Sequence, residues 1–123
     1  MSKTILIADD DTLITQLFHL GCEQSERNLT VISANNGTTA ISQIEEKSPD
    51  VVVLDLRMPQ GDGFSVLEFM QSHNLSIPVV VLTNSLTEEN YARCQKYGVK
   101  ECLIKHEMKL DGIVDRVCAC MTC

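Results

Sequence analysis

The stretch Val51-Val52-Val53-Leu54-Asp55 decides the fold, because an unbroken apolar run ends there in a carboxylate. Consecutive apolar residues of this kind are typical of a central strand that helices cover on both faces. The run Val79-Val80-Val81-Leu82 has the same character, and Pro78 precedes it at a position where a strand tolerates a missing N–H. The two runs predict two central strands of a parallel sheet.

Apolar segments of strand length alternate with longer segments along the whole chain, without a linker or an internal repeat. The expected strands are Thr4–Ala8, Leu29–Ala34, Val51–Leu54, Val79–Thr83 and Glu101–Ile104. Strict alternation with right-handed crossovers predicts an α/β fold, in which five helices cover a doubly wound, five-stranded parallel sheet. We expect the strand order 2-1-3-4-5, which is one of the two common orders for this architecture.

Between the strands, apolar residues recur at the spacing of a helix, which predicts a helix in each interval and one after the last strand. Thr87 is expected to cap the fourth helix, which ends before Gly98, and His106-Glu107 lies at the start of the fifth. The apolar stripes are expected at Leu13, Leu17 and Leu20, flanked by Ile14, Phe18 and Gly21, in the first helix; at Ala40, Ile41 and Ile44 in the second; at Phe64, Leu67 and Met70 in the third; and at Leu110, Ile113, Val114, Val117, Cys118 and Met121 in the fifth.

The length of 123 residues is typical of one domain, and 44% of the residues are hydrophobic. The apolar run from Ile5 to Ala8 is too short for a signal peptide, and no segment reaches the roughly 18 apolar residues of a membrane span. The formal net charge is −7 without a basic cluster, which argues against nucleic acid as a direct partner. We therefore expect a single cytoplasmic domain over residues 1–123, with no membrane partner.

The chain contains six cysteines, most of them in the last third. Without a secretion signal we expect reduced thiols that act as small, partly buried hydrophobic residues. The terminal run Cys118-Ala-Cys120-Met-Thr-Cys123 also suggests a metal site. Residues two apart on a continuing helix point in nearly opposite directions, however, and a fourth ligand is not obvious. The sequence therefore favours the reduced-thiol interpretation.

Polar residues follow four of the expected strands directly. They are Asp9, Asp10 and Asp11 after the first strand, Asp55 after the third, Thr83 at the end of the fourth and Lys105 after the fifth. In an open parallel sheet, ligands bind outside the carboxyl ends of the strands where the strand order reverses, so we expect these side chains to converge. Clustered carboxylates repel one another, and a hard cation such as Mg²⁺ relieves that repulsion. Lys105 and Thr83 add a positive charge and a hydroxyl donor, which suits a bound phosphoryl group.

Acidic residues after strands also cap helices, and this simpler interpretation explains Asp11 and Asp62 taken singly. It does not explain suitable chemistry at four strand ends at once. We therefore interpret Asp11 as a capping residue and keep the other residues as a site.

In its motifs the chain resembles the receiver domain of two-component response regulators, a flavodoxin-like fold, over essentially its whole length. The motifs are Ile5-Leu6-Ile7-Ala8-Asp9-Asp10; Asp55-Leu56-Arg57-Met58-Pro59 with Gly61-Asp62-Gly63-Phe64; Val81-Leu82-Thr83; and Tyr97-Gly98-Val99 leading to Leu103-Ile104-Lys105. The resemblance implies a phosphorelay signalling domain that catalyses only its own phosphorylation and dephosphorylation, and that has no effector domain in this chain.

The resemblance also implies a role for each site residue. Asp55 is the phosphorylated residue; Asp10, Asp55 and the backbone carbonyl of Arg57 bind Mg²⁺, and Asp9 supports the ion. Thr83 and Lys105 bind the phosphoryl oxygens. The donor is a phosphohistidine on a sensor histidine kinase or a histidine phosphotransfer protein. The side chains of Arg57 and Ser85 are expected to tune the lifetime of the phosphorylated state.

The sequence departs from the family pattern at two positions. Similar domains carry an aromatic switch residue three positions before the lysine, where this chain has Cys102, and a proline after the lysine, where it has His106. In those domains the switch remodels the face of the fourth helix, fifth strand and fifth helix, which binds a downstream protein. We expect phosphorylation to be retained here while its coupling to that face is weakened or carried by the loop after Thr83.

Two alternatives belong to other functional classes. A receiver-like adaptor would bind partners without phosphorylation. The retained site residues argue against it, and they are Asp9, Asp10, Asp55, Thr83 and Lys105. A phosphohydrolase of the haloacid dehalogenase type would use Asp9 as nucleophile, because Asp9-x-Asp11 follows the first strand. That reading requires an acidic pair after a late strand, where this chain has Thr83 and Lys105 instead.

Overall fold

The computed structural model describes residues 2–84 and 86–121, which form one five-stranded parallel sheet with helices on both faces. The strand order is β2-β1-β3-β4-β5, as the sequence predicts. The elements are β1 (Lys3–Ala8), α1 (Thr12–Gln24), β2 (Leu29–Ala34), α2 (Gly37–Lys47), β3 (Val51–Leu54), α3 (Gly63–Ser72), β4 (Val79–Thr83), α4 (Glu88–Lys96), β5 (Glu101–Ile104), the 3-10 turn η1 (Lys105–Glu107) and α5 (Leu110–Met121). Only β1 begins earlier than expected, by one residue.

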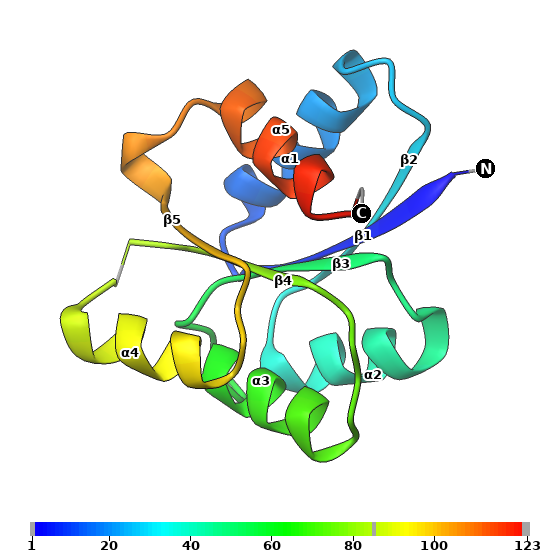
Figure 1. Ribbon diagram of the computed structural model, residues 1–123. Coiled ribbons are helices and arrows are strands. Elements are labelled where there is room, and N and C mark those ends of the chain that lie inside the picture. The colour runs from blue at the N-terminus through cyan, green and yellow to red at the C-terminus, as the bar shows by residue number, and fades with distance from the viewer. Residues whose placement is uncertain (1, 85, 122–123) are drawn as a thin grey trace.

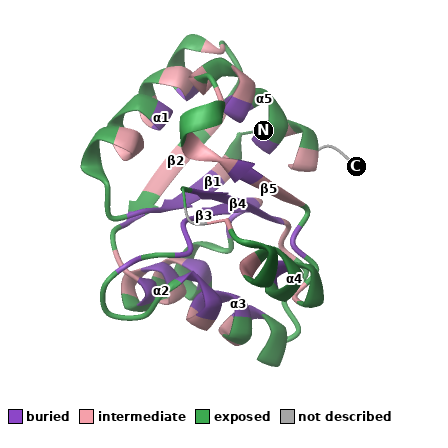
Figure 2. Ribbon diagram, turned by 90° about the vertical axis from the view of Figure 1, so that its left-hand side faces the viewer, coloured by how far each residue is buried: buried purple, intermediate pink, exposed green. Residues whose placement is uncertain are grey.

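The helices form two layers, with α1 and α5 above the sheet and α2, α3 and α4 below it (Figure 1). Successive side chains of a strand point to opposite faces. In β3, Val51 and Val53 therefore join the upper core, whereas Val52 and Leu54 join the lower one. Each of these side chains is almost fully buried, which stabilises the fold by about 1.5–3 kcal/mol per residue. Figure 2 shows this buried sheet between the two helical layers.

Helix α1 differs from the prediction in the side that it buries. Phe18 and Cys22 are its buried residues, whereas Leu13, Leu17 and Leu20 are 60%, 40% and 45% exposed. The predicted leucine stripe was therefore wrong as a buried stripe. The side of α1 that packs against the sheet is offset by one residue from the leucines. It carries Ile14, Phe18 and Cys22.

The other helical stripes are confirmed. The interior residues of α2, α3 and α5 are buried or half-buried, Thr87 caps α4 by accepting the Asn90 N–H, and Gly98 adopts a left-handed φ of 73° just beyond the end of α4. His106 and Glu107, however, do not begin the fifth helix. They belong to η1, and an extended Met108 separates that turn from α5, which begins at Leu110.

The loop after β3 packs closely against the first residues of α2 and α3, and both of these residues are glycines. A Cβ on Gly63 would lie 2.5 Å from the Asp55 carbonyl oxygen and 2.8 Å from the Leu56 Cα. A Cβ on Gly37 would lie 2.2 Å from the Gly61 carbonyl oxygen. These contacts are with backbone atoms, which cannot rotate away. Helices α2 and α3 therefore fix the position of the loop that leaves Asp55.

We predict that Gly63→Ala lowers the free energy of unfolding by about 1–3 kcal/mol, the usual cost of forcing extra volume into a packed site. Urea unfolding would measure the change. Gly112→Ala is the matched control. Gly112 lies within helix α5, and a Cβ there would meet only the Met108 Cε atom, at 3.7 Å. That control should be neutral or stabilising by up to ~1 kcal/mol. Equal stability of the Gly63→Ala variant and the native chain would contradict the packing argument.

Candidate functional site at the carboxyl edge of the sheet

Three carboxylates converge at the carboxyl ends of β1 and β3. The two strands are hydrogen-bonded neighbours, and their last residues, Ala8 and Leu54, stand opposite each other. Asp9, Asp10 and Asp55 follow them, and one carboxylate oxygen of each lies within 4.8 Å of the others. Asp9 and Asp55 are only 2% and 6% exposed, whereas Asp10 is exposed. The convergence expected from the strand order is therefore confirmed.

Lys105 reaches this cluster from the end of β5. Its ammonium nitrogen lies 2.7 Å from Asp9 Oδ2 and 2.9 Å from Asp55 Oδ2. The Lys105 side chain is 10% exposed, so all three charges are largely removed from water. Burial acts to lower the pKa of Lys105, but the hydrogen bonds and negative charges of Asp9 and Asp55 outweigh it and raise that pKa above its ordinary value. Lys105 therefore stays charged and bridges the two carboxylates.

Asp9 is the most enclosed acid of the cluster. Its Oδ1 accepts the Asp11 N–H at 2.9 Å, whereas its buried Oδ2 receives no well-directed hydrogen bond, because the contact with Lys105 is close but poorly aligned. Burial raises the pKa of Asp9 above its ordinary value, although Lys105 and the Asp11 N–H act in the opposite direction. An incompletely satisfied buried carboxylate oxygen is costly, and it leaves a place for a further positive ligand.

The residues present suit a hard divalent cation. The three carboxylates carry three negative charges when ionised, and Lys105 supplies one positive charge, so the cluster keeps an excess of negative charge. Its available donors are all oxygen atoms, which Mg²⁺ prefers over nitrogen and sulfur. This donor set fits the acidic Mg²⁺ pocket that receiver domains generally have.

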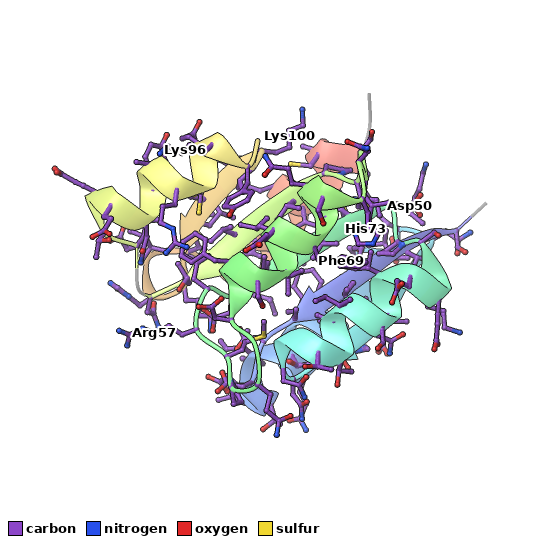
Figure 3. All side chains as sticks on the ribbon, turned by 90° about the horizontal axis from the view of Figure 1, so that it is seen from below. Asp50, Arg57, Phe69, His73, Lys96 and Lys100 are labelled. Atoms are coloured by element: carbon purple, nitrogen blue, oxygen red, sulfur yellow. The ribbon has the colours of Figure 1, made fainter. Side chains whose placement is uncertain are left out.

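Asp55 is held through both of its oxygens. Oδ2 accepts from Lys105, and Oδ1 accepts the Arg57 N–H at 3.3 Å, a long hydrogen bond. The Arg57 side chain is exposed, and Figure 3 shows it at the opposite end of the lower layer from Asp50 and His73. Asp55 thus lies at the carboxyl edge of the sheet, where Asp9, Thr83 and Lys105 also lie.

Thr83 is buried at the end of β4, opposite Ile104 of β5 in the parallel register. Since β4 lies between β3 and β5, Thr83 occupies the strand end between Asp55 and Lys105. Ser85, the second residue expected to tune the site, falls outside the described residues. Asp11 and Asp62 serve as helix caps, since the carboxylate of Asp11 accepts the N–H groups of Leu13 and Ile14 and that of Asp62 accepts the Ser65 N–H. The capping interpretation of Asp11 is confirmed.

Cys102 lies on β5 below the sheet, half-buried against the lower core, to which the buried Cys94 of α4 also belongs. Burial, together with the neighbouring Cys94, raises the pKa of the Cys102 thiol to about 12. Cys118 of α5 packs instead against the upper core. All five described cysteines are free thiols, as predicted, and Cys123 falls outside the described residues.

Sequence reasoning missed Asn84, which follows Thr83 directly. Its Oδ1 accepts the backbone N–H of His106 at 3.1 Å and lies 2.8 Å from His106 Nδ1. The available signal was positional, because each partner is the residue next to a predicted phosphoryl-binding residue. The contact itself depends on the geometry of two loops and leaves no sequence pattern.

Within the described part of the chain, no helix combines the length and the apolar character needed to cross a membrane.

Comparison with known proteins agrees with this geometry. The family described as "Response regulator receiver domain" matches residues 5–117. The chain is 35% identical to the alkaline phosphatase synthesis transcriptional regulatory protein PhoP of Bacillus subtilis over 83 residues, which are 68% of this chain and 34% of that protein. It spans less than half the length of this relative and of the other curated relatives compared with it.

Solved structures show the same fold. The receiver domain of the Francisella response regulator 1452 superposes with a TM-score of 0.86 at 29% identity, covering 97% of this chain and 96% of that one. The signal receiver domain of a LuxO repressor protein from Vibrio parahaemolyticus gives a TM-score of 0.90, covering 98% and 91%, and at 20% identity it supports the fold alone. The matched family profile, the strand order and the acidic edge agree, and the chain belongs to the response regulator receiver domain family.

Proposed function

We propose that this domain is the phospho-acceptor of a two-component phosphorelay and that Asp55 accepts a phosphoryl group from a phosphohistidine. The observation that carries the proposal is the Lys105 ammonium between Asp9 and Asp55, at 2.7 and 2.9 Å. In-line phosphoryl transfer needs mainly positioning and charge stabilisation, and this arrangement supplies both next to a carboxylate nucleophile. The partner is a sensor histidine kinase or a histidine phosphotransfer protein in the cytoplasm.

The bonds and electrons of the phosphoryl transfer balance with Asp55 and the phosphohistidine alone. A carboxylate oxygen of Asp55 forms a bond to phosphorus while the bond between phosphorus and the donor's imidazole nitrogen breaks, and the electron pair of that bond leaves with the imidazole. The product on Asp55 is a mixed anhydride, which water hydrolyses in time. Lys105 and the hydroxyl of Thr83 would hold the phosphoryl oxygens. The hydrogen bond from Lys105 to Asp55 and the position of Thr83 at the end of β4, the strand between β3 and β5, support these roles.

Mg²⁺ would be held by the carboxylates of Asp10 and Asp55 and the backbone carbonyl of Arg57, with Asp9 supporting it. When bound, it neutralises the negative charge of the incoming phosphoryl group. The excess of carboxylates over the single ammonium group of Lys105 supports this assignment. A downstream protein would bind the face of α4, β5 and α5, where Cys102 occupies the position of the usual switch residue.

We predict that the native chain, incubated with Mg²⁺ and a small phosphodonor such as acetyl phosphate, gains the mass of one phosphoryl group and that Asp55→Asn does not. Asn lacks the nucleophilic carboxylate but keeps the shape of the side chain. Intact-mass spectrometry would measure the adduct. Asp115→Asn is the matched control, because Asp115 is an exposed aspartate of α5 that pairs with Arg27.

The outcome separates the three functional classes. An adduct that survives Asp55→Asn but disappears in Asp9→Asn would favour the phosphohydrolase. No adduct on the native chain under conditions where Mg²⁺ binds would favour an adaptor that works without phosphorylation. An adduct lost only in Asp55→Asn supports the phospho-acceptor.

The raised pKa of Asp9 gives a second prediction, on stability. A group whose pKa is raised in the folded state stabilises the fold below its unfolded value of 3.8, and that stabilisation is lost as the pH rises through the folded pKa. Asp9→Asn removes this ionisation. In the presence of a chelator, the variant should therefore gain stability relative to the native chain as the pH rises toward neutral, by at most about 1.4 kcal/mol per pH unit.

Urea unfolding across the pH range would measure this difference, with Asp115→Asn as a control for an exposed aspartate. Added Mg²⁺ should narrow the difference at neutral pH, because an ion beside Asp9 stabilises its charged form. A difference that stays constant with pH, or that Mg²⁺ leaves unchanged, would contradict the assignment of Asp9.

A further inference from the structure

The loops after β4 and β5 are joined by side-chain hydrogen bonds. Asn84, directly after β4, presents one Oδ1 atom to two groups of His106, the backbone N–H at 3.1 Å and the ring Nδ1 at 2.8 Å. A backbone N–H can only donate, so the shared atom is the amide oxygen and not the amide nitrogen. Nδ1 must then carry a hydrogen in order to bond the same oxygen. The contact thus fixes both the orientation of Asn84 and the proton on Nδ1 of His106.

This contact lies just beyond the last paired residues of the sheet. Thr83 and Ile104 are the final partners of the β4–β5 ladder, and Asn84 and His106 lie one and two residues further along. In Figure 1 the end of β4 and the turn η1 that follows β5 both lie on the left-hand side of the molecule. Asn84 therefore links two segments beyond the point where the ladder ends.

Both partners are adjacent to residues that contact or flank Asp55. Asn84 follows the buried Thr83, and His106 follows Lys105, whose ammonium bonds Asp55 Oδ2 at 2.9 Å. A phosphoryl group on Asp55 adds negative oxygens at this point, so Lys105 and Thr83 must adjust to bind them. Movement of either residue pulls on the next one along the chain. Because Asn84 and His106 are bonded to each other, displacement of one loop is passed to the other.

We propose that the Asn84–His106 contact is a latch that makes the loop after β4 and the turn η1 respond to phosphorylation of Asp55 as one unit. The inference rests on the proposed function of Asp55. On one side the latch leads to Thr87, the cap of α4, and on the other to η1 and the start of α5. The latch thus links the segment before α4 to the segment before α5. It does so without an aromatic residue on β5, where this chain has Cys102. Asn84 and His106 act as positioning residues, since neither bonds Asp55.

The first experiment tests whether the latch exists. It is done on the unphosphorylated protein. Nitrogen-15 chemical shifts of the histidine rings, recorded near pH 9 where a free imidazole is neutral, report which nitrogen carries the proton. The proposal expects hydrogen on Nδ1 of His106 in the native chain and a shift toward the Nε2 form in Asn84→Ala. Hydrogen on Nε2 of His106 in the native chain would overturn the proposal.

The second experiment tests coupling, with beryllium fluoride and Mg²⁺ as an analogue of the phosphoryl group. Amide chemical shifts of Glu107 and Met108 should change in the native chain when the analogue binds. In Asn84→Ala these changes should fall to the background, while the amides next to Asp55 still respond. His106→Ala should weaken the response, and His106→Asn should restore it, because the Asn amide nitrogen occupies nearly the same place as Nδ1.

His73→Ala is the matched control, because His73 is also an exposed histidine with a ring hydrogen bond, to the Phe69 carbonyl at 3.0 Å, but lies at the other end of the molecule (Figure 3). It should leave the response unchanged. A native response at Glu107 and Met108 in Asn84→Ala would overturn the latch. If the native chain binds no analogue although Nδ1 of His106 carries the proton, the proposed function fails, and the coupling role is rejected with it.

Discussion

The buried contact of one ammonium group with two carboxylates is the interaction on which the site depends. Lys105 lies within 3 Å of both Asp9 and Asp55, and these three residues come from the ends of three different strands. Removing one partner of a buried ion pair typically costs about 3–5 kcal/mol, because the remaining charge is left without compensation. The strand order places β1 and β3 side by side and β5 two strands from β3, and it thereby brings the three groups within reach. The topology of the sheet is thus a condition for the chemistry.

The burial of these charges also explains why the site lowers the stability of the fold. Asp9 is almost fully buried, one of its oxygens has no well-directed hydrogen bond, and burial raises its pKa. A core made only of the apolar strands would avoid this cost, and proteins tend to break local rules of stability at functional sites. The unbroken apolar runs of β3 and β4 supply the opposing free energy, since every residue of both strands is buried. The buried sheet therefore carries a cluster of charges at its edge whose burial is costly.

The sequence predicts the strands and the convergence of the acids well, because both depend on strong local patterns and on one general rule of parallel sheets. It predicts the buried side of α1 poorly, since Leu13, Leu17 and Leu20 are as apolar as the residues that are buried, and only tertiary packing decides between them. The separate turn η1 and the contact between Asn84 and His106 escape prediction for a different reason. Both depend on how two loops meet beyond the ends of their strands, and no periodicity records that geometry.

The geometry also bears on the choice between Asp55 and Asp9 as nucleophile. Asp9 has one oxygen bonded to the Asp11 N–H at 2.9 Å and the other 2.7 Å from Lys105, so both are held closely. Asp55 has one oxygen whose only described contact is the long bond to the Arg57 N–H at 3.3 Å, and that oxygen is the easier one to free for attack. A hydrolase that starts from Asp9 would also need Asp11 as its second acid, yet the carboxylate of Asp11 is occupied in capping α1. The hydrogen bonds of the three acids therefore favour Asp55 as the acceptor and Asp9 as a support for charge.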